Sequence, residues 1–96
     1  MIRREGGRIV VSGAVTLANV TKVMEEGKRH LDEGVHIVDL SEVNDMDSSL
    51  LAMLFAWLRD ARAHERNVSF VHLPESLQTI ARLYGVDGLL PAASPA

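Results

Sequence analysis

The chain has 96 residues, of which 47 % are hydrophobic and 24 % are charged, and these are the proportions of an ordinary globular domain. It contains no cysteine, which excludes disulfides, thiolate metal sites and thiol nucleophiles. The formal net charge is −3, and the lysines and arginines are scattered among acids, so the basic face of a nucleic-acid-binding protein is not expected.

A single domain is expected over residues 1–91, followed by a C-terminal tail over residues 92–96 that is rich in alanine and proline. No stretch approaches the roughly 20 apolar residues that a membrane-spanning helix needs. The N-terminus lacks the apolar segment of a signal peptide. The expected location is therefore the cytoplasm, without direct insertion into a membrane.

The first part of the chain predicts a hairpin and then a helix. Residues 1–13 read as two short strands around Gly6 and Gly7, because glycine supplies the positive φ that a tight hairpin turn requires. Thr16 is a candidate N-cap for a helix that runs to about Leu31. The apolar residues on the expected core side of this helix are Leu17, Val20, Val23, Met24 and Leu31.

A strand and a second helix are expected next. Gly34 ends the first helix. Residues 35–40 form a strand with apolar side chains on both faces, as in a strand at the centre of a sheet. Residues 41–46 read as a polar connection, and a second helix begins near Asp47 or Ser48 and runs to about His64.

The last part predicts one more strand and a third helix. Residues 67–73 have strand character. Pro74 then opens a helix at the first-turn position that proline prefers, and Gly85 closes it. The apolar side of this helix carries Leu77, Ile80, Ala81 and Tyr84, and a last short helical turn is expected to contain Val86, Leu89 and Leu90.

The alternation of strands and helices predicts an α/β fold. Strand–helix–strand repeats imply right-handed crossovers and parallel pairing, and the N-terminal hairpin adds an antiparallel edge. The expected architecture is a mixed, mostly parallel four-stranded sheet packed with about four helices.

The informative segment begins where the loop after the third strand becomes the second helix, at Asp47, Ser48 and Ser49. Aspartate or serine at this point accepts hydrogen bonds from the unpaired N–H groups of the helix. A phosphate added to Ser48 or Ser49 would meet the same donors. The triplet is therefore consistent with simple capping or with a phosphorylation site.

The second helix carries two apolar stripes. The stripe expected to face the core comprises Leu50, Leu51, Leu54, Leu58 and Ala61. Met53, Trp57 and His64 form a second stripe on a flank. Because tryptophan and methionine are enriched at protein interfaces, this flank predicts either a partner contact or a cover for the edge of the sheet.

Together these segments resemble the STAS domain family. The resemblance rests on Asp39-Leu40-Ser41, Val43, residues 46–49 and the helix start at residues 50–54. It extends over nearly the whole chain and implies the fold of the anti-sigma factor antagonists. Residues 68–73, 77–86 and 89–91 are most similar to the MlaB-like branch, whose members are STAS subunits of bacterial Mla phospholipid-transport ABC complexes.

What the resemblance implies is a non-catalytic adaptor that binds and supports the cytoplasmic ATPase subunit of such a complex, at the periphery of the inner membrane. The hydroxyl that matters for that contact corresponds to Ser48. The expected partner-binding residues are Asp47, Ser48, Ser49, Leu50, Met53 and Trp57.

The alternative function is an anti-sigma factor antagonist, with an anti-sigma factor or serine kinase as its partner. The phosphorylated hydroxyl of such proteins corresponds to Ser49 here, with Ser48 as the other possible phosphoacceptor. Most relatives place glycine after the hydroxyl pair, whereas this chain has Leu50, which is expected to crowd the backbone where a kinase would dock.

Enzymatic activity, a cofactor and a metal are not expected. The carboxylates of Asp39, Asp45 and Asp47 do not have the spacing of a calcium-binding loop. The chain has no nucleophile elbow, phosphate-binding loop or dinucleotide-binding fingerprint. Nucleotide binding at the start of the second helix is a third possibility, but no glycine-rich loop or basic residue stands next to it.

Overall fold

A computed structural model describes residues 1–91, and the tail expected over residues 92–96 lies outside the described residues. Four strands form one sheet in the order β1-β2-β3-β4. β1 pairs with β2 in antiparallel fashion, while β2–β3 and β3–β4 are parallel, so the expected mixed sheet is confirmed. The strands are β1 (Ile2–Glu5), β2 (Arg8–Val15), β3 (Ile37–Met46) and β4 (Ser69–Val71).

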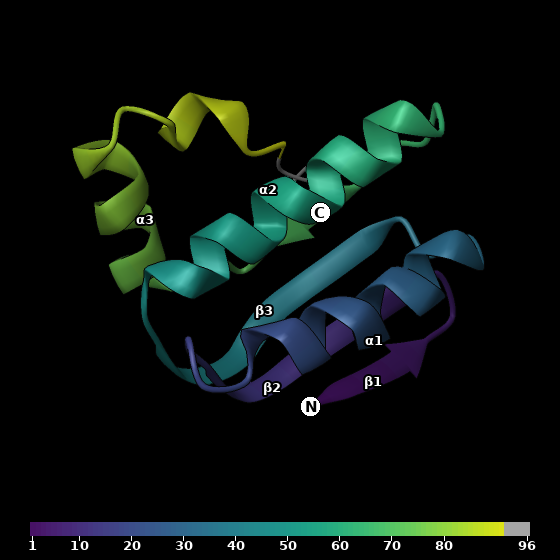
Figure 1. The fold of residues 1–96 in the computed structure, drawn as a ribbon, viewed down its shortest axis with the longest axis horizontal. Coiled ribbons are helices and arrows are strands. Elements are labelled where there is room, and N and C mark those ends of the chain that lie inside the picture. Colours follow the sequence, from purple (N-terminus) through teal and green to yellow (C-terminus); the bar gives the residue numbers. More distant parts are fainter. Residues whose placement is uncertain (92–96) are drawn as a thin grey trace.

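Within the described residues there are three α-helices rather than about four: α1 (Val20–Asp32), α2 (Ser48–Ala63) and α3 (Glu75–Leu83). The last helical turn, expected around Leu89, is the single 3-10 turn η1 (Asp87–Leu89). The two parallel crossovers advance in the same direction across the sheet, so α1 and α2 lie side by side on one face. Figure 1 shows α3 at one end of this helical layer.

The core lies between the sheet and the α1–α2 layer. It is lined by Ile9 and Val11 from β2, by Val38 and Leu40 from β3, and by Phe70 from β4, all of which are buried. The five apolar residues of α2 that were expected to face the core are also buried. No helix in residues 1–91 is long and apolar enough to cross a membrane.

The hairpin between β1 and β2 is built as expected. Glu5 and Arg8 close the turn, and Gly6 has a φ of +63°, a conformation that side chains other than glycine rarely adopt. Gly7 has a different constraint, because the ring of His36 lies where its side chain would be. A Cβ on Gly7 would meet His36 Cε1 at 2.7 Å.

The start of the first helix differs from the prediction. α1 begins at Val20, and Thr16 is not its N-cap. The reason is local hydrogen bonding: Asn19 Oδ1 accepts the Thr16 N–H at 2.9 Å, and the Asn19 amide donates to the Ala14 carbonyl at 2.8 Å. These bonds fold residues 16–19 into a loop, which leaves Leu17 outside the helix.

The strand β3 is longer than predicted. Residues 41–46, expected to be a polar connection, continue the strand as far as Met46. They pair with β2 from Ser12 to Val15, whereas β4 pairs only with residues 37–39. Because β2 supplies the backbone partners, this segment stays in the sheet although most of its side chains are exposed.

The third helix follows the prediction closely but not fully. Pro74 is the N-cap of α3 rather than its first residue, and Gly85, with a φ of +70°, terminates the helix as expected. Tyr84 was expected on the core side of this helix but is exposed, because the helix ends one residue earlier. After η1 the chain returns to the sheet, where the Phe70 N–H donates to the Pro91 carbonyl at 2.9 Å.

Candidate functional site

Asp47 joins the start of α2 to the loop between β2 and α1. It is the N-cap of α2, and its Oδ1 accepts the Ser49 N–H at 2.8 Å. Its Oδ2 accepts the Leu17 N–H at 2.9 Å, so one carboxylate fixes two segments. The hydrogen bonds from Leu17 and then from Ser49 hold the pKa of this carboxyl below its usual range, because both stabilise the charged form. The predicted capping role is confirmed.

The two serines of the triplet have different surroundings. Ser48 is the first residue of α2 and is exposed, whereas Ser49 is partly buried and uses its backbone N–H in the cap. Among the residues expected to bind a partner, Ser48 is therefore the one that is most open to solvent. Its position at a helix N-terminus also places it close to partial positive charge.

The prediction that Met53 and Trp57 lie on an exposed flank of α2 is wrong. Both side chains are only 1 % exposed, so neither can contact a partner directly. Trp57 is covered by α1, where Gly27 leaves room for the indole ring: a Cβ on Gly27 would overlap Trp57 Cζ2. The indole Nε1 also donates to the Met24 carbonyl at 3.0 Å. Trp57 therefore joins α1 to α2.

Leu50, also expected to bind a partner, is part of the core. Its side chain is 0 % exposed, because the residue already lies within the first turn of α2 and points toward the sheet. The expected crowding of the surface at this position is therefore wrong. Because the Leu50 side chain lies in the core, it does not cover the backbone beside Ser48 and Ser49.

Sequence reasoning missed Leu17, which lies next to this site. It was expected in the core of the first helix, yet its side chain is 80 % exposed and its backbone is bonded to Asp47. The available signal was Asn19, since asparagine stands among the preferred residues for helix N-termini. A helix start at that residue would have left Leu17 in a loop.

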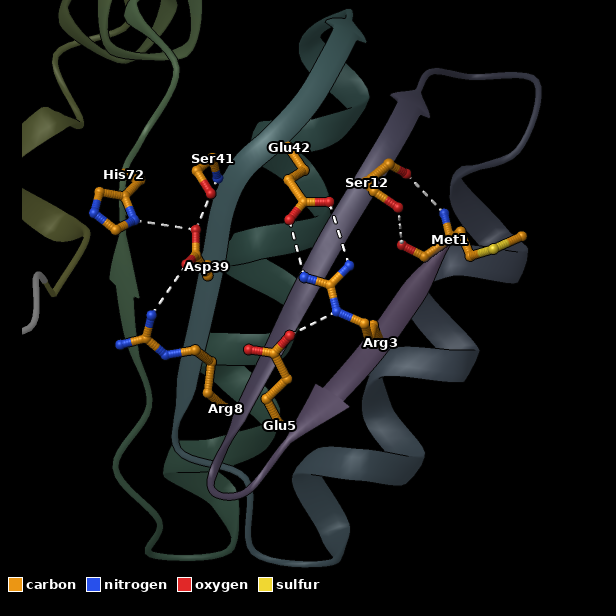
Figure 2. A network of polar contacts seen from close by, with 9 residues as sticks. All are labelled: Met1, Arg3, Glu5, Arg8, Ser12, Asp39, Ser41, Glu42 and His72. Carbon is orange, nitrogen blue, oxygen red and sulfur yellow. Dashed lines mark hydrogen bonds and ion pairs between the residues drawn. The ribbon is translucent and has the colours of Figure 1, made fainter.

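A second polar cluster lies on the sheet face that α1 and α2 do not cover (Figure 2). The Asp39 side chain is only 8 % exposed and accepts hydrogen bonds from Arg8 at 3.1 Å and from the Ser41 N–H at 2.9 Å. His72 Nδ1 lies 3.1 Å from Oδ1, the oxygen that also accepts the Ser41 N–H, whereas Arg8 contacts Oδ2. Burial by itself raises the pKa of Asp39, but the hydrogen bonds from Ser41 and His72 outweigh it and leave that pKa below its usual range.

This cluster has a structural explanation. Val10 faces the same side of the sheet, paired with Arg3 on one side and Asp39 on the other, and it is buried without belonging to the main core. The paired charges of the cluster therefore cover an apolar residue. In residues 1–91 no group of three histidine, aspartate or glutamate side chains is placed to hold a metal ion.

The family model described as Mlab, STAS domain, matches residues 2–91. The chain belongs to the STAS domain family. The MlaB label of the matching model agrees with the resemblance seen in the third helix and the segment that follows it. STAS domains of this kind are generally binding domains without catalytic activity. No curated protein sequence matched the chain.

Solved structures support the STAS fold. The anti-sigma factor antagonist SpoIIAA in its unphosphorylated form is similar with a TM-score of 0.71 and 12 % identity, over 98 % of this chain and 87 % of the other. The Bacillus cell fate determinant SpoIIAA in the phosphorylated form gives a TM-score of 0.67 at 12 % identity, over 98 % and 90 % of the two chains. At such identities the similarity concerns the fold alone.

A third similar structure is much larger. The crystal structure of Mglu matches with a TM-score of 0.57 and 20 % identity, over 78 % of this chain but only 19 % of the other. A fold similar to that of this chain is thus found both over most of a small protein and over a minor part of a longer one.

Proposed function

We propose that this STAS domain is a non-catalytic adaptor that binds and supports the cytoplasmic ATPase subunit of a bacterial phospholipid-transport ABC complex. The domain would then lie at the inner membrane through its partner. The observation that carries the proposal is the exposed Ser48 at the first residue of α2, on a backbone held by Asp47. The MlaB label of the matching family model supports this class of partner.

The contact residues in this proposal are a smaller set than the sequence indicated. Asp47, Ser48 and Ser49 lie at the surface or close to it, whereas Leu50, Met53 and Trp57 stabilise the helix from beneath. A partner that binds here meets the end of a rigid helix. Little conformational entropy is lost on binding such a surface, which favours a permanent contact.

The substitution Ser48→Arg tests the proposal. The large charged side chain would occupy the place of the partner, so we expect the ATPase subunit to lose affinity by tenfold or more. The matched control is Ala63→Arg, which puts the same side chain on an exposed position at the other end of α2. The measurement is co-purification of the two subunits expressed together, followed by titration of the purified partners.

The result that contradicts the proposal is a Ser48→Arg variant that co-purifies with the ATPase subunit as well as the wild type does. Loss of the complex with both arginine variants would also count against it, since a contact centred on Ser48 predicts that Ala63→Arg binds normally. Melting temperatures close to that of the wild type would show that both variants are folded.

We propose, as a second function, an anti-sigma factor antagonist controlled by phosphorylation. What favours it is the pair of serines at a helix N-terminus, where a phosphate would meet backbone N–H groups. Leu50 does not obstruct this surface, because its side chain is in the core. The neighbouring carboxylate of Asp47 opposes it through charge repulsion.

Mass spectrometry tests the second proposal. If a serine kinase acts here, incubation with that kinase and ATP places a phosphate on Ser49, or on Ser48, and the matching Ser→Ala variant abolishes it. A chain that stays unmodified at both serines, in cells and with every serine kinase of the source organism, contradicts the second proposal.

A further inference from the structure

The exposed leucine of the β2–α1 loop lies beside the proposed contact site. Leu17 is 80 % exposed, more than any other large hydrophobic residue in the described part of the chain. Its backbone N–H is bonded to Asp47, which immediately precedes Ser48. Scattered exposed leucines are ordinary on protein surfaces. Leu17 differs from such residues because hydrogen bonds fix the backbone that carries it.

The loop that carries Leu17 is fixed at every residue. Besides the bond to Asp47, the Thr16 N–H donates to Asn19 Oδ1 at 2.9 Å, and the Ala18 N–H lies 3.3 Å from Thr16 Oγ1. The Asn19 and Val20 N–H groups both donate to the Thr16 carbonyl, at 3.0 and 2.9 Å. The apolar side chain therefore projects from an ordered backbone, so little backbone conformational entropy is lost when it binds.

The charges around Leu17 indicate what kind of surface it fits. The segments 12–19 and 41–49 that form this end of the sheet contain Glu42, Asp45 and Asp47 but no lysine or arginine. Glu42 is paired with Arg3, whereas Asp45 is exposed and has no ion pair among residues 1–91. The N-terminal ammonium donates to the Ser12 carbonyl at 2.8 Å, and Lys22 borders a groove between α1 and Met1 that Asn19 also lines. Among the described residues, Asp45 and Asp47 thus leave two carboxylates without an ion pair in the segments next to Leu17, and one of them is bonded to the Leu17 backbone.

We propose that Leu17 is the apolar anchor of the partner contact, positioned by Asp47, and that the partner receives it in an apolar pocket flanked by lysine or arginine. The inference rests on the proposed function, since the partner is the same ATPase subunit. A second copy of this chain fits poorly, because a two-fold contact through this surface would bring the acidic groups of both copies together.

Titration calorimetry of the purified ATPase subunit against variants of the full chain tests the anchor. Burial of a leucine side chain in an apolar pocket is favourable, so Leu17→Ser should raise the dissociation constant by about tenfold or more. Leu17→Met keeps an apolar side chain of similar size and should stay within about threefold. Leu83→Ser, which alters a leucine 77 % exposed on α3, is the matched control and should bind like the wild type.

The charge argument has its own measurement. Asp45→Lys should weaken binding, and the affinity of the wild type should fall as sodium chloride is raised, because surface charge pairs are screened by salt. If neither Asp45→Lys nor added sodium chloride changes the affinity, the proposal that lysine or arginine flanks the partner's pocket is wrong.

The outcomes separate the anchor from the function. If Ser48→Arg abolishes binding while Leu17→Ser binds like the wild type, the adaptor function stands and the anchor is wrong. If Leu83→Ser weakens binding as much as Leu17→Ser does, the anchor is also wrong, because the loss is not specific to this loop. If the wild type does not bind the ATPase subunit at all, both proposals are overturned. Capture of a second copy through Leu17, seen as a dimer that Leu17→Ser dissociates, would overturn the proposed partner.

Discussion

Replacement of Trp57 by alanine is expected to destabilise the domain by about 3–5 kcal/mol, which is the usual cost of removing a buried aromatic side chain. The indole is 1 % exposed, fills the space that Gly27 leaves on α1, and donates a hydrogen bond to the Met24 carbonyl. A domain of this size is stable by only about 5–15 kcal/mol. Urea denaturation followed by circular dichroism should therefore show a midpoint at a much lower urea concentration than that of the wild type.

The same contact predicts a coupled effect at Gly27. A Cβ there would overlap Trp57 Cζ2, so Gly27→Ala should destabilise by about 1–3 kcal/mol although alanine is the better helix former. In a Trp57→Leu background the clash is relieved and the cost should largely vanish. Gly88→Ala is the control, since a Cβ at Gly88 meets nothing within 4 Å. Equal costs of Gly27→Ala in both backgrounds would contradict this packing.

Loss of Trp57 should also weaken the proposed partner contact, but indirectly. The ring holds α2 against α1, and Ser48 stands at the first residue of α2. A variant that is folded yet has a loosened α2 would present this residue less rigidly. Trp57, which the sequence offered as a possible partner contact, therefore supports the proposed contact from beneath by packing α2 against α1.

The elements that could be predicted from the sequence are those with local causes. Gly6 and Gly85 adopt the positive φ that their turns require, and Asp47 caps the helix that follows it. The five apolar residues at helical spacing in α2 all face the core. The signal for each of these features lies in residues that are neighbours in the chain.

The features that were missed depend on distant partners. The burial of Trp57 requires a glycine at position 27 on another helix, and no periodicity within α2 reveals that α1 will lie on that side. Residues 41–46 became strand because β2 was available to pair with them. In both cases the tertiary neighbour, rather than local preference, determined the outcome.

The capping pattern at the start of α2 was predicted correctly, but three residues of the expected contact set, Leu50, Met53 and Trp57, are buried. Asp47 and Ser48 lie as the capping pattern indicated, at the start of α2. Leu17 was assigned to the core, because the Thr16-based start of the helix turned it inward. Asn19 and Asp47 instead hold it in a loop, and the bond from Leu17 to Asp47 joins residues that are 30 positions apart.

Asp39 carries the second large effect on stability. Asp39→Ala would leave the Ser41 N–H without its acceptor and the Arg8 guanidinium without its partner, on a carboxylate site that is only 8 % exposed. The expected loss is about 1–3 kcal/mol, measured by urea denaturation at pH 7. Asp45→Asn, a change to an exposed acid, should cost less than about 0.5 kcal/mol. Equal losses in the two variants would mean that the network around Asp39 contributes nothing specific.

The contribution of Asp39 to the free energy of unfolding should decrease as the pH falls. Hydrogen bonds from Ser41 and His72 outweigh burial and leave the pKa of the folded carboxyl below that of the unfolded chain, so the charged form stabilises the fold. That stabilisation is complete above the unfolded value of about 4 and is lost as the pH falls through the lower folded value. The difference in unfolding free energy between the wild type and Asp39→Asn should therefore narrow from pH 5 to pH 2.5. A difference that widens over this range would mean that the protonated carboxyl is the form that the fold prefers.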